Sequence, residues 1–126
     1  MLDLDHFKQA NDAFGHGAGD AILVETAERL RKLVRSDDAV VRLGGDEFAI
    51  ILRDTDARDA RRAVDRVLKA MLETHGYHGH VIHIGASAGV AVGSESDHSV
   101  SDIITRADAA LYVAKQEGRN TWRWAA

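Results

Sequence analysis

The spacing of apolar residues along the chain predicts three long amphipathic helices. The first runs to about Val34 from Asp20, which is a suitable N-cap or first-turn acid. The second extends from about Ala57 to Thr74, and the third extends from Ser99 to Glu117. Gly118 follows the third helix and suits the left-handed conformation that often ends a helix. These helices account for much of the chain.

The first nineteen residues follow a different pattern. Met1–Leu4 is apolar and resembles the end of a strand, and His6–Phe14 has the spacing of a short helix. The segment Gly15–Gly19 carries three glycines and is therefore expected to form a flexible loop before the first long helix.

Short β-rich runs complete the pattern. Val40–Leu43 and Phe48–Leu52 flank Gly44 and Gly45, a composition that predicts a hairpin whose turn needs positive φ. Val81–Val92 alternates well enough for one or two strands, and Asn120–Trp124 is expected to be the last strand. Together with the helices, these runs predict a single α+β domain over residues 1–126, with helices on one or both faces of a sheet.

Composition narrows the classes of function. The chain is 45% hydrophobic and 29% charged, as is usual for a folded globular domain. Its formal charge of −4 and its lack of clustered cations argue against nucleic acid as a partner. No segment reaches the apolar length of a membrane span or has the pattern of a signal peptide, so no membrane contact is expected. The absence of cysteine fits a reducing compartment, and the cytoplasm is the expected location.

Two acids at predicted strand ends suggest a metal-dependent reaction. Asp3 lies at the end of the first strand, and Asp46 follows the Gly-Gly turn of the hairpin. Mg²⁺ prefers hard oxygen ligands and uses few protein carboxylates when phosphate oxygens complete its coordination. If the first strand lies beside the hairpin, both acids can reach the same ions. Taken alone, a strand-end Asp is usually solvated, and Gly-Gly-Asp is common turn chemistry.

Motifs along nearly the whole chain resolve this ambiguity. They are Gly44-Gly45-Asp46-Glu47-Phe48, Asp3-Leu4-Asp5-His6-Phe7-Lys8, Asn11-Asp12, Gly15-His16, Gly19-Asp20, Arg106-Ala107-Asp108, Leu111-Tyr112, Ala114-Lys115 and Gly118-Arg119-Asn120. In their order and spacing these motifs resemble the GGDEF family of diguanylate cyclases, which are bacterial signalling enzymes. The resemblance implies a nucleotide-cyclase or polymerase-palm fold, which is a ferredoxin-like, largely antiparallel sheet flanked by helices. It also implies the condensation of two GTP molecules to cyclic di-GMP.

The resemblance assigns the chemical roles to five residues. Asp3, Asp46 and the backbone carbonyl of Leu4 would bind two Mg²⁺ ions per site, with Mn²⁺ as an alternative ion. Asp46 would also act as the general base for the ribose 3′-hydroxyl, and Glu47 would contact metal or nucleotide. Lys8 would place positive charge on the phosphates being transferred.

The substrate contacts come from the same resemblance. Asn11 and Asp20 match the positions that recognise the guanine edge, and His16 would lie near the same nucleotide. Lys115 and Arg119 match the positions that contact the triphosphate. Without the family, His16 would be a loop histidine with a local hydrogen bond, and the two cations would simply favour a helix C-terminus.

A third group of residues suggests regulation by the product. Arg35 and Asp38 match the RxxD inhibitory site at which many of these enzymes bind cyclic di-GMP, and Arg66 occupies the place of a secondary contact. A guanidinium can hold a phosphate or a guanine edge through two hydrogen bonds. The alternative is a surface ion pair of small energetic value.

One family signature is missing from the sequence. Family members carry a DxLTGLxNR segment before the first strand, and the chain is therefore expected to be an N-terminally truncated GGDEF domain. Catalysis would need a homodimer, and the full protein would carry an upstream sensory domain and could be membrane-anchored. The alternative function is that of a catalytically inactive sensor that binds GTP or cyclic di-GMP.

Overall fold

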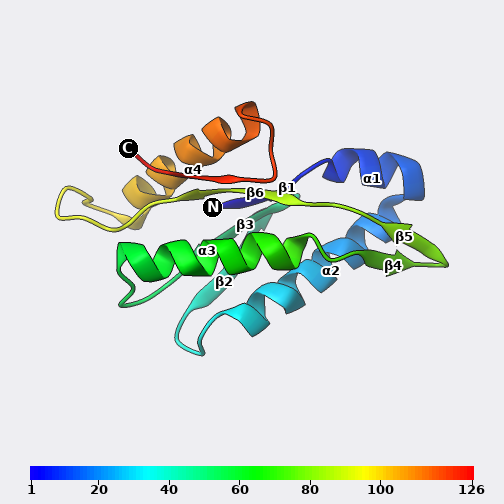
Figure 1. Ribbon diagram of the computed structural model, residues 1–126, viewed down its shortest axis with the longest axis horizontal. Helices are drawn as coiled ribbons and strands as arrows, with labels where there is room; N and C mark the ends of the chain where they lie inside the picture. The colour runs from blue at the N-terminus through cyan, green and yellow to red at the C-terminus, as the bar shows by residue number, and fades with distance from the viewer.

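A computed structural model describes all 126 residues as an α+β fold with one main sheet (Figure 1). No helix combines the length and the apolar character that a membrane crossing requires. The elements in chain order are β1 (Leu2–Leu4), α1 (Phe7–Phe14), α2 (His16–Leu33), β2 (Ala39–Gly44), β3 (Glu47–Ile51), α3 (Ala57–Met71), β4 (His75–Tyr77), β5 (His80–Ile82), β6 (Ala86–Val90), α4 (Val100–Gln116) and β7 (Trp122–Trp124).

The main sheet has five strands in the order β2-β3-β1-β6-β7. All neighbours are antiparallel except β6 and β7, which run parallel. The short strand β1 therefore lies at the centre, where Leu2 pairs with Phe48 on one side and with Ala88 on the other. This placement confirms the predicted α+β class and the largely antiparallel sheet.

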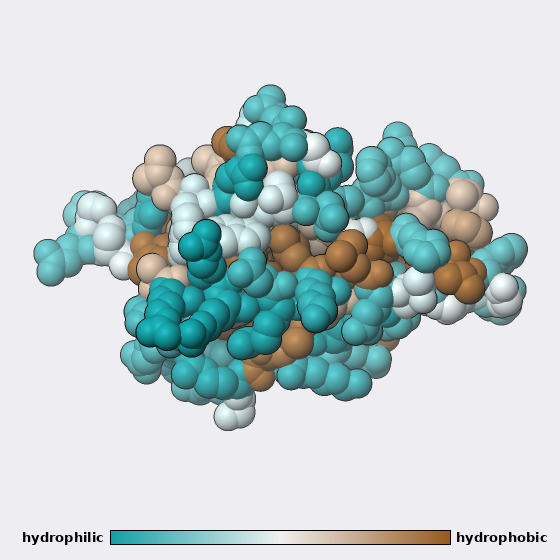
Figure 2. Space-filling view, in the orientation of Figure 1, coloured by the Kyte–Doolittle hydropathy of each residue, from teal (hydrophilic) through white to brown (hydrophobic).

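The hydrophobic core lies between the sheet and helices α2 and α3. Leu2, Leu4 and Phe48 point from the sheet into this core, where Ile22 and Leu30 of α2 meet them. The apolar face of α3 completes the cluster. Figure 2 shows that apolar groups also reach the surface, where they form a broken band between hydrophilic side chains.

Helix α4 covers the opposite face of the sheet. Side chains alternate between faces along a strand, so Gly89, which follows Ala88 of the core, faces away from α2 and α3. A Cβ atom at Gly89 would lie 2.0 Å from the backbone oxygen of Ala107 in α4. Asp3, between Leu2 and Leu4, faces the same way, and its side chain consequently points toward α4.

The start of α2 differs from the prediction. The segment after Gly15 is helical from His16 onward, so Asp20 lies inside the helix and is not its N-cap. Gly15 has φ +90° and separates α1 from α2. Gly17 and Gly19 do not loosen the chain, because they allow close approach of Tyr77 and of Asn11, respectively. Tertiary packing overrides their weak helix propensity.

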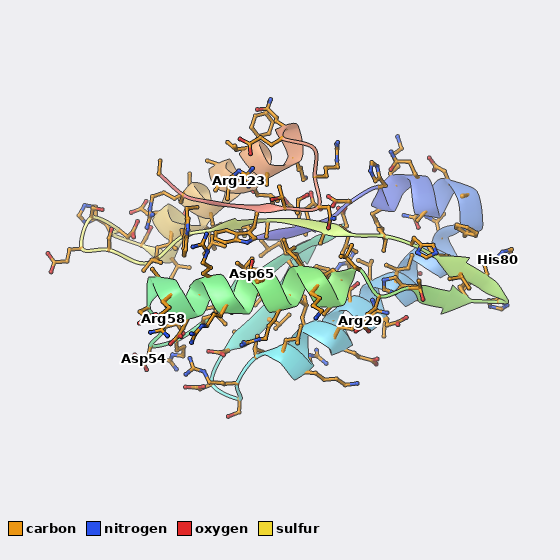
Figure 3. The ribbon with its side chains drawn as sticks, viewed as in Figure 1. Arg29, Asp54, Arg58, Asp65, His80 and Arg123 are labelled. Atoms are coloured by element: carbon orange, nitrogen blue, oxygen red, sulfur yellow. The ribbon has the colours of Figure 1, made fainter.

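The segment after α3 also differs from the prediction. The helix ends at Met71 instead of Thr74, and β4 pairs with β5 in a separate two-stranded sheet. Arg29, which extends from α2 (Figure 3), fixes this change of direction by donating hydrogen bonds to the carbonyls of Glu73 and Thr74 at 2.9 and 2.7 Å. The predicted region Val81–Val92 covers all of β6 and all but the first residue of β5.

Candidate active site

The fold brings Asp3 and Asp46 together from different strands. Asp3 of β1 lies opposite Glu47 of β3, and the Leu4 N–H donates to the Asp46 carbonyl at 3.4 Å. The hairpin turn therefore lies beside the end of β1, as the sequence predicts. Gly44 and Gly45 have φ of +147° and +51°, which glycine tolerates without steric cost.

A charged side chain braces this turn. Arg42 donates from Nε to the carbonyl of Gly45 at 2.8 Å, next to an irregularity in the pairing between Arg42 and Gly44. The turn is thus held in one conformation, and Asp46 projects from a fixed backbone.

The surroundings of Asp46 change its acidity. Burial raises the pKa of Asp46 to about 6, and the negative charge of the neighbouring Asp3 adds to this effect. The positive charge of Lys115 acts in the opposite direction and lowers the pKa of Asp46. Lys115 lies at the end of α4, where it forms an ion pair with Asp3. A cation between the acids would relieve their mutual repulsion.

The donor set fits a magnesium site. The Oδ1 atom of Asp3 is buried and has no hydrogen-bond partner, although buried carboxylate oxygens are normally paired. The N–H and C=O groups of one strand residue point to the same side, so the Leu4 carbonyl points toward the hairpin that its N–H contacts. Two carboxylates and one carbonyl are the hard ligands that Mg²⁺ takes alongside phosphate and water.

Asn11 lies on α1 against the first turns of α2. Its Oδ1 atom is buried without a partner, and a Cβ atom at Gly19 would lie only 1.8 Å from it. Gly19 therefore makes the space that the Asn11 amide occupies. Lys8, His16 and Asp20 are exposed on the same two helices, with their side chains free of hydrogen bonds and ion pairs.

The end of α4 carries the two remaining predicted cations. Lys115 is half-buried against Asp3, whereas Arg119 is exposed in the turn that follows the helix. Gly118 has φ +112° just past the C-cap, as predicted for a C′ residue. The structure thus places Lys115 at the acids and Arg119 in the exposed turn after the helix.

Comparison with known proteins agrees with this arrangement. The family model described as "Diguanylate cyclase, GGDEF domain" matches residues 1–121. The chain belongs to the GGDEF family. It is 40% identical over 120 residues to the bifunctional diguanylate cyclase/cyclic di-GMP phosphodiesterase MucR of Pseudomonas aeruginosa, covering 95% of this chain and 18% of MucR. It is likewise 40% identical over 121 residues to diguanylate cyclase A of Treponema denticola, covering 95% of this chain and 33% of that protein.

Solved GGDEF domains share the fold closely. The GGDEF domain of TpbB (YfiN) from Pseudomonas aeruginosa superposes with a TM-score of 0.94 at 36% identity, covering 99% of this chain and 79% of that one. The GGDEF domain of DgcB from Caulobacter crescentus, solved in complex with c-di-GMP, gives a TM-score of 0.92 at 30% identity, covering 98% and 74%. The chain thus spans only a third or less of the two curated relatives, but most of these structural ones.

Two of the three predicted inhibitory residues of this GGDEF domain, Arg35 and Asp38, form a local hydrogen-bond network. Asp38 accepts hydrogen bonds from the backbone N–H groups of Arg35 and Arg53 at 2.9 and 3.0 Å, and its side chain is only 2% exposed. These bonds hold the pKa of Asp38 below its usual value. The Arg35 side chain is 59% exposed and also reaches Thr55. Arg66 is exposed on α3 and makes no hydrogen bond or ion pair with either residue.

Sequence reasoning missed three residues that shape the GGDEF site. Asp5 and Ser87 form a buried hydrogen bond behind the strand ends, and Tyr77 packs its hydroxyl over Gly17 at the start of α2. The Asp3-Leu4-Asp5 spacing drew attention to Asp5, but alternation along a strand says nothing of its partner. Ser87 and Tyr77 carried no signal, because their contacts join segments far apart in the sequence.

Proposed function

We propose that this GGDEF domain is a diguanylate cyclase, which condenses two GTP molecules to cyclic di-GMP and pyrophosphate. The convergence of Asp3, Asp46 and the Leu4 carbonyl, with one buried carboxylate oxygen left unpaired, carries the proposal. The names of the relatives support it, since several are diguanylate cyclases.

In the proposed reaction, the 3′-oxygen of one GTP bonds to the α-phosphorus of another. The bond from that phosphorus to the bridging oxygen breaks, and pyrophosphate leaves. Asp46 takes the hydroxyl proton, and the raised pKa of this carboxyl makes it a stronger base than an ordinary Asp. Asp3, Asp46 and the Leu4 carbonyl would hold two Mg²⁺ ions, which supply Lewis-acid stabilisation of the phosphates when bound.

The remaining predicted residues would orient the substrate. Asn11 and Asp20 would recognise guanine, with His16 nearby and Glu47 as a further contact. Lys8, Lys115 and Arg119 would hold the phosphates. Two chains would have to face each other as a homodimer, so that each 3′-hydroxyl reaches the other nucleotide.

The test is the Asp46→Ala variant, assayed with GTP and Mg²⁺ by chromatography of the products. We expect cyclic di-GMP formation to fall by at least about a hundredfold, since both a metal ligand and a base are lost. Glu95→Ala, in an exposed loop, serves as the matched control and should retain wild-type rates. A wild-type rate in Asp46→Ala with an unchanged fold would overturn the assignment.

We propose in addition that cyclic di-GMP binds at Arg35, which is exposed enough to grip a phosphate or guanine edge while Asp38 holds the loop. Removal of the guanidinium in Arg35→Ala should weaken cyclic di-GMP binding about tenfold or more, measured by calorimetry. Arg31→Ala, exposed on α2, is the control. Equal affinity in all three proteins would remove this site.

The alternative function is that of a sensor. Binding of GTP or cyclic di-GMP by the wild type without any product formation would favour it.

A further inference from the structure

A buried polar network lies directly behind the candidate active site. Asp5 is 5% exposed and Ser87 is fully buried. The Ser87 hydroxyl donates to Oδ1 of Asp5 at 2.7 Å, and the backbone N–H of Asn120 donates to Oδ2 at 2.9 Å. The same N–H lies 3.1 Å from the Ser87 oxygen. Three segments, at the ends of β1, β6 and α4, are therefore joined by one carboxylate.

The segment that this network holds has an unusual backbone. Gly118, Arg119 and Asn120 all have positive φ, at +112°, +66° and +48°. Left-handed conformations are unfavourable for residues other than glycine, and least so for Asn, so they persist where the surroundings impose them. The Arg119 N–H donates to the Ala114 carbonyl at 3.1 Å, but the next N–H, of Asn120, has only Asp5 and Ser87 as partners.

The network also fixes the end of β1. The Asp5 N–H donates to the Gly85 carbonyl at 2.8 Å, which holds the peptide unit that contains the Leu4 carbonyl. The backbone of Asp5 thus fixes the peptide unit of a proposed metal ligand, whereas its carboxylate holds the turn that contains Arg119.

We infer that Asp5, together with Ser87, is a positioning residue that aims Arg119 at the triphosphate of bound GTP. This inference rests on the proposed function. A carboxylate suits position 5, because two donors converge on it from different elements and its two oxygens accept from both through charge-assisted hydrogen bonds. In Asp5→Asn, the side chain keeps a single acceptor oxygen and loses its charge, so the hydrogen bond from the Asn120 N–H is no longer charge-assisted and the turn is held less firmly.

The experiment is a double-mutant cycle between Asp5→Asn and Arg119→Ala. Affinity is measured for 3′-deoxyGTP, which lacks the attacking hydroxyl, so that binding is observed without turnover. A lost charge-assisted contact corresponds to about a tenfold change in Kd. We expect each single variant to raise Kd about tenfold, and Asp5→Asn to add less than about twofold once Arg119 is already Ala.

Two further readouts separate positioning from general damage. Asp5→Asn should raise KM for GTP while leaving kcat within about threefold, and trypsin should cleave faster after Arg119 once the turn is released. Asp97→Asn is the matched control, because its carboxylate also anchors a backbone N–H, that of Ser94, at the other end of α4. This variant should leave Kd unchanged.

If Asp5→Asn fails to fold, Ser87→Ala takes its place in the cycle, since it removes the hydroxyl that holds Oδ1 of Asp5 and one of the two acceptors of the Asn120 N–H. Independent, additive losses of affinity in the cycle would overturn the inference while leaving the cyclase assignment intact. A wild-type chain that neither binds nor converts GTP would overturn the proposed function, and this inference with it.

Discussion

At the scale of single residues, the environment gives two identical side chains different chemical properties. Asp3 and Asp46 are both aspartates of the candidate site, yet Asp3 is paired with Lys115 while burial keeps the pKa of Asp46 at about 6. The same contrast separates Asp3 from Asp5, which is satisfied by Ser87 and a backbone N–H. The properties of each aspartate therefore depend on the groups that contact it, and the fold determines which groups those are.

The Gly19→Ala substitution tests the proposed guanine pocket. The added Cβ would lie 1.8 Å from Oδ1 of Asn11 and would displace that amide. We expect affinity for GTP to fall about tenfold, whereas the free energy of unfolding should change by less than about 1 kcal/mol, because the helix gains from alanine. Gly76→Ala meets no atom within 4 Å and serves as the control. Unchanged GTP affinity in Gly19→Ala would show that Asn11 does not recognise the base.

Motif residues could be recognised from the sequence, but their partners could not. Asp46 and its turn were predictable because Gly-Gly imposes a local geometry that the structure retains. The ion pair between Asp3 and Lys115 joins residues 112 positions apart, and no local pattern encodes such a contact. Ser87 was missed for the same reason.

At the scale of elements, local propensity predicted the long helices and the hairpin but failed where packing decides. The sequence predicts a loop at the start of α2, because Gly17 and Gly19 are weak helix formers, but the structure is helical there. Their value lies in the close contacts they permit. Strand β4 was missed because three residues with a central glycine have no strand pattern, and their conformation depends on pairing with β5.

The packing of α4 on β6 gives a prediction at this scale. In Gly89→Ala, the new methyl group would lie 2.0 Å from the Ala107 oxygen and 2.3 Å from the Leu111 nitrogen, both backbone atoms that cannot move aside. The helix must shift, so we expect the free energy of unfolding in urea to fall by about 3 kcal/mol. Gly93→Ala makes only an ordinary 3.6 Å contact and should cost less than about 1 kcal/mol. Similar stabilities for both variants would contradict this packing.

At the scale of the whole molecule, a buried histidine links stability to pH. His75 is 2% exposed and lies between Glu25, whose Oε2 is 3.2 Å from Nδ1, and Arg29, whose Nη1 is 3.4 Å from Nε2. Burial lowers the pKa of His75, and the charge of Arg29 adds to this effect, while Glu25 opposes it. The ring therefore stays neutral in the folded chain at pH values where the unfolded chain takes up a proton.

Acidification therefore removes the contribution of His75 to the free energy of unfolding. The stability from neutral His75 is fully present above the unfolded pKa of about 6.5 and is lost as pH falls through the lower folded pKa. The contribution of Asp46 to stability has the opposite sign, because the pKa of this carboxyl is raised to about 6.

The contribution of His75 is measured by comparing wild type with His75→Gln in urea unfolding from pH 8 to 5. We expect the wild type to lose more stability than the variant on acidification. Parallel curves would contradict the prediction, and His98→Gln, at an exposed position, should follow the wild type.

The ion pair between Asp3 and Lys115 has a consequence for protein synthesis. One partner lies in the first strand and the other near the end of the last helix, and β1 occupies the centre of the sheet between strands that are made later. During translation, the proposed metal ligands are therefore made before Lys115. A nascent chain that ends before α4 carries both acids but lacks the cation that pairs with Asp3, so the candidate site is complete only once α4 has been made.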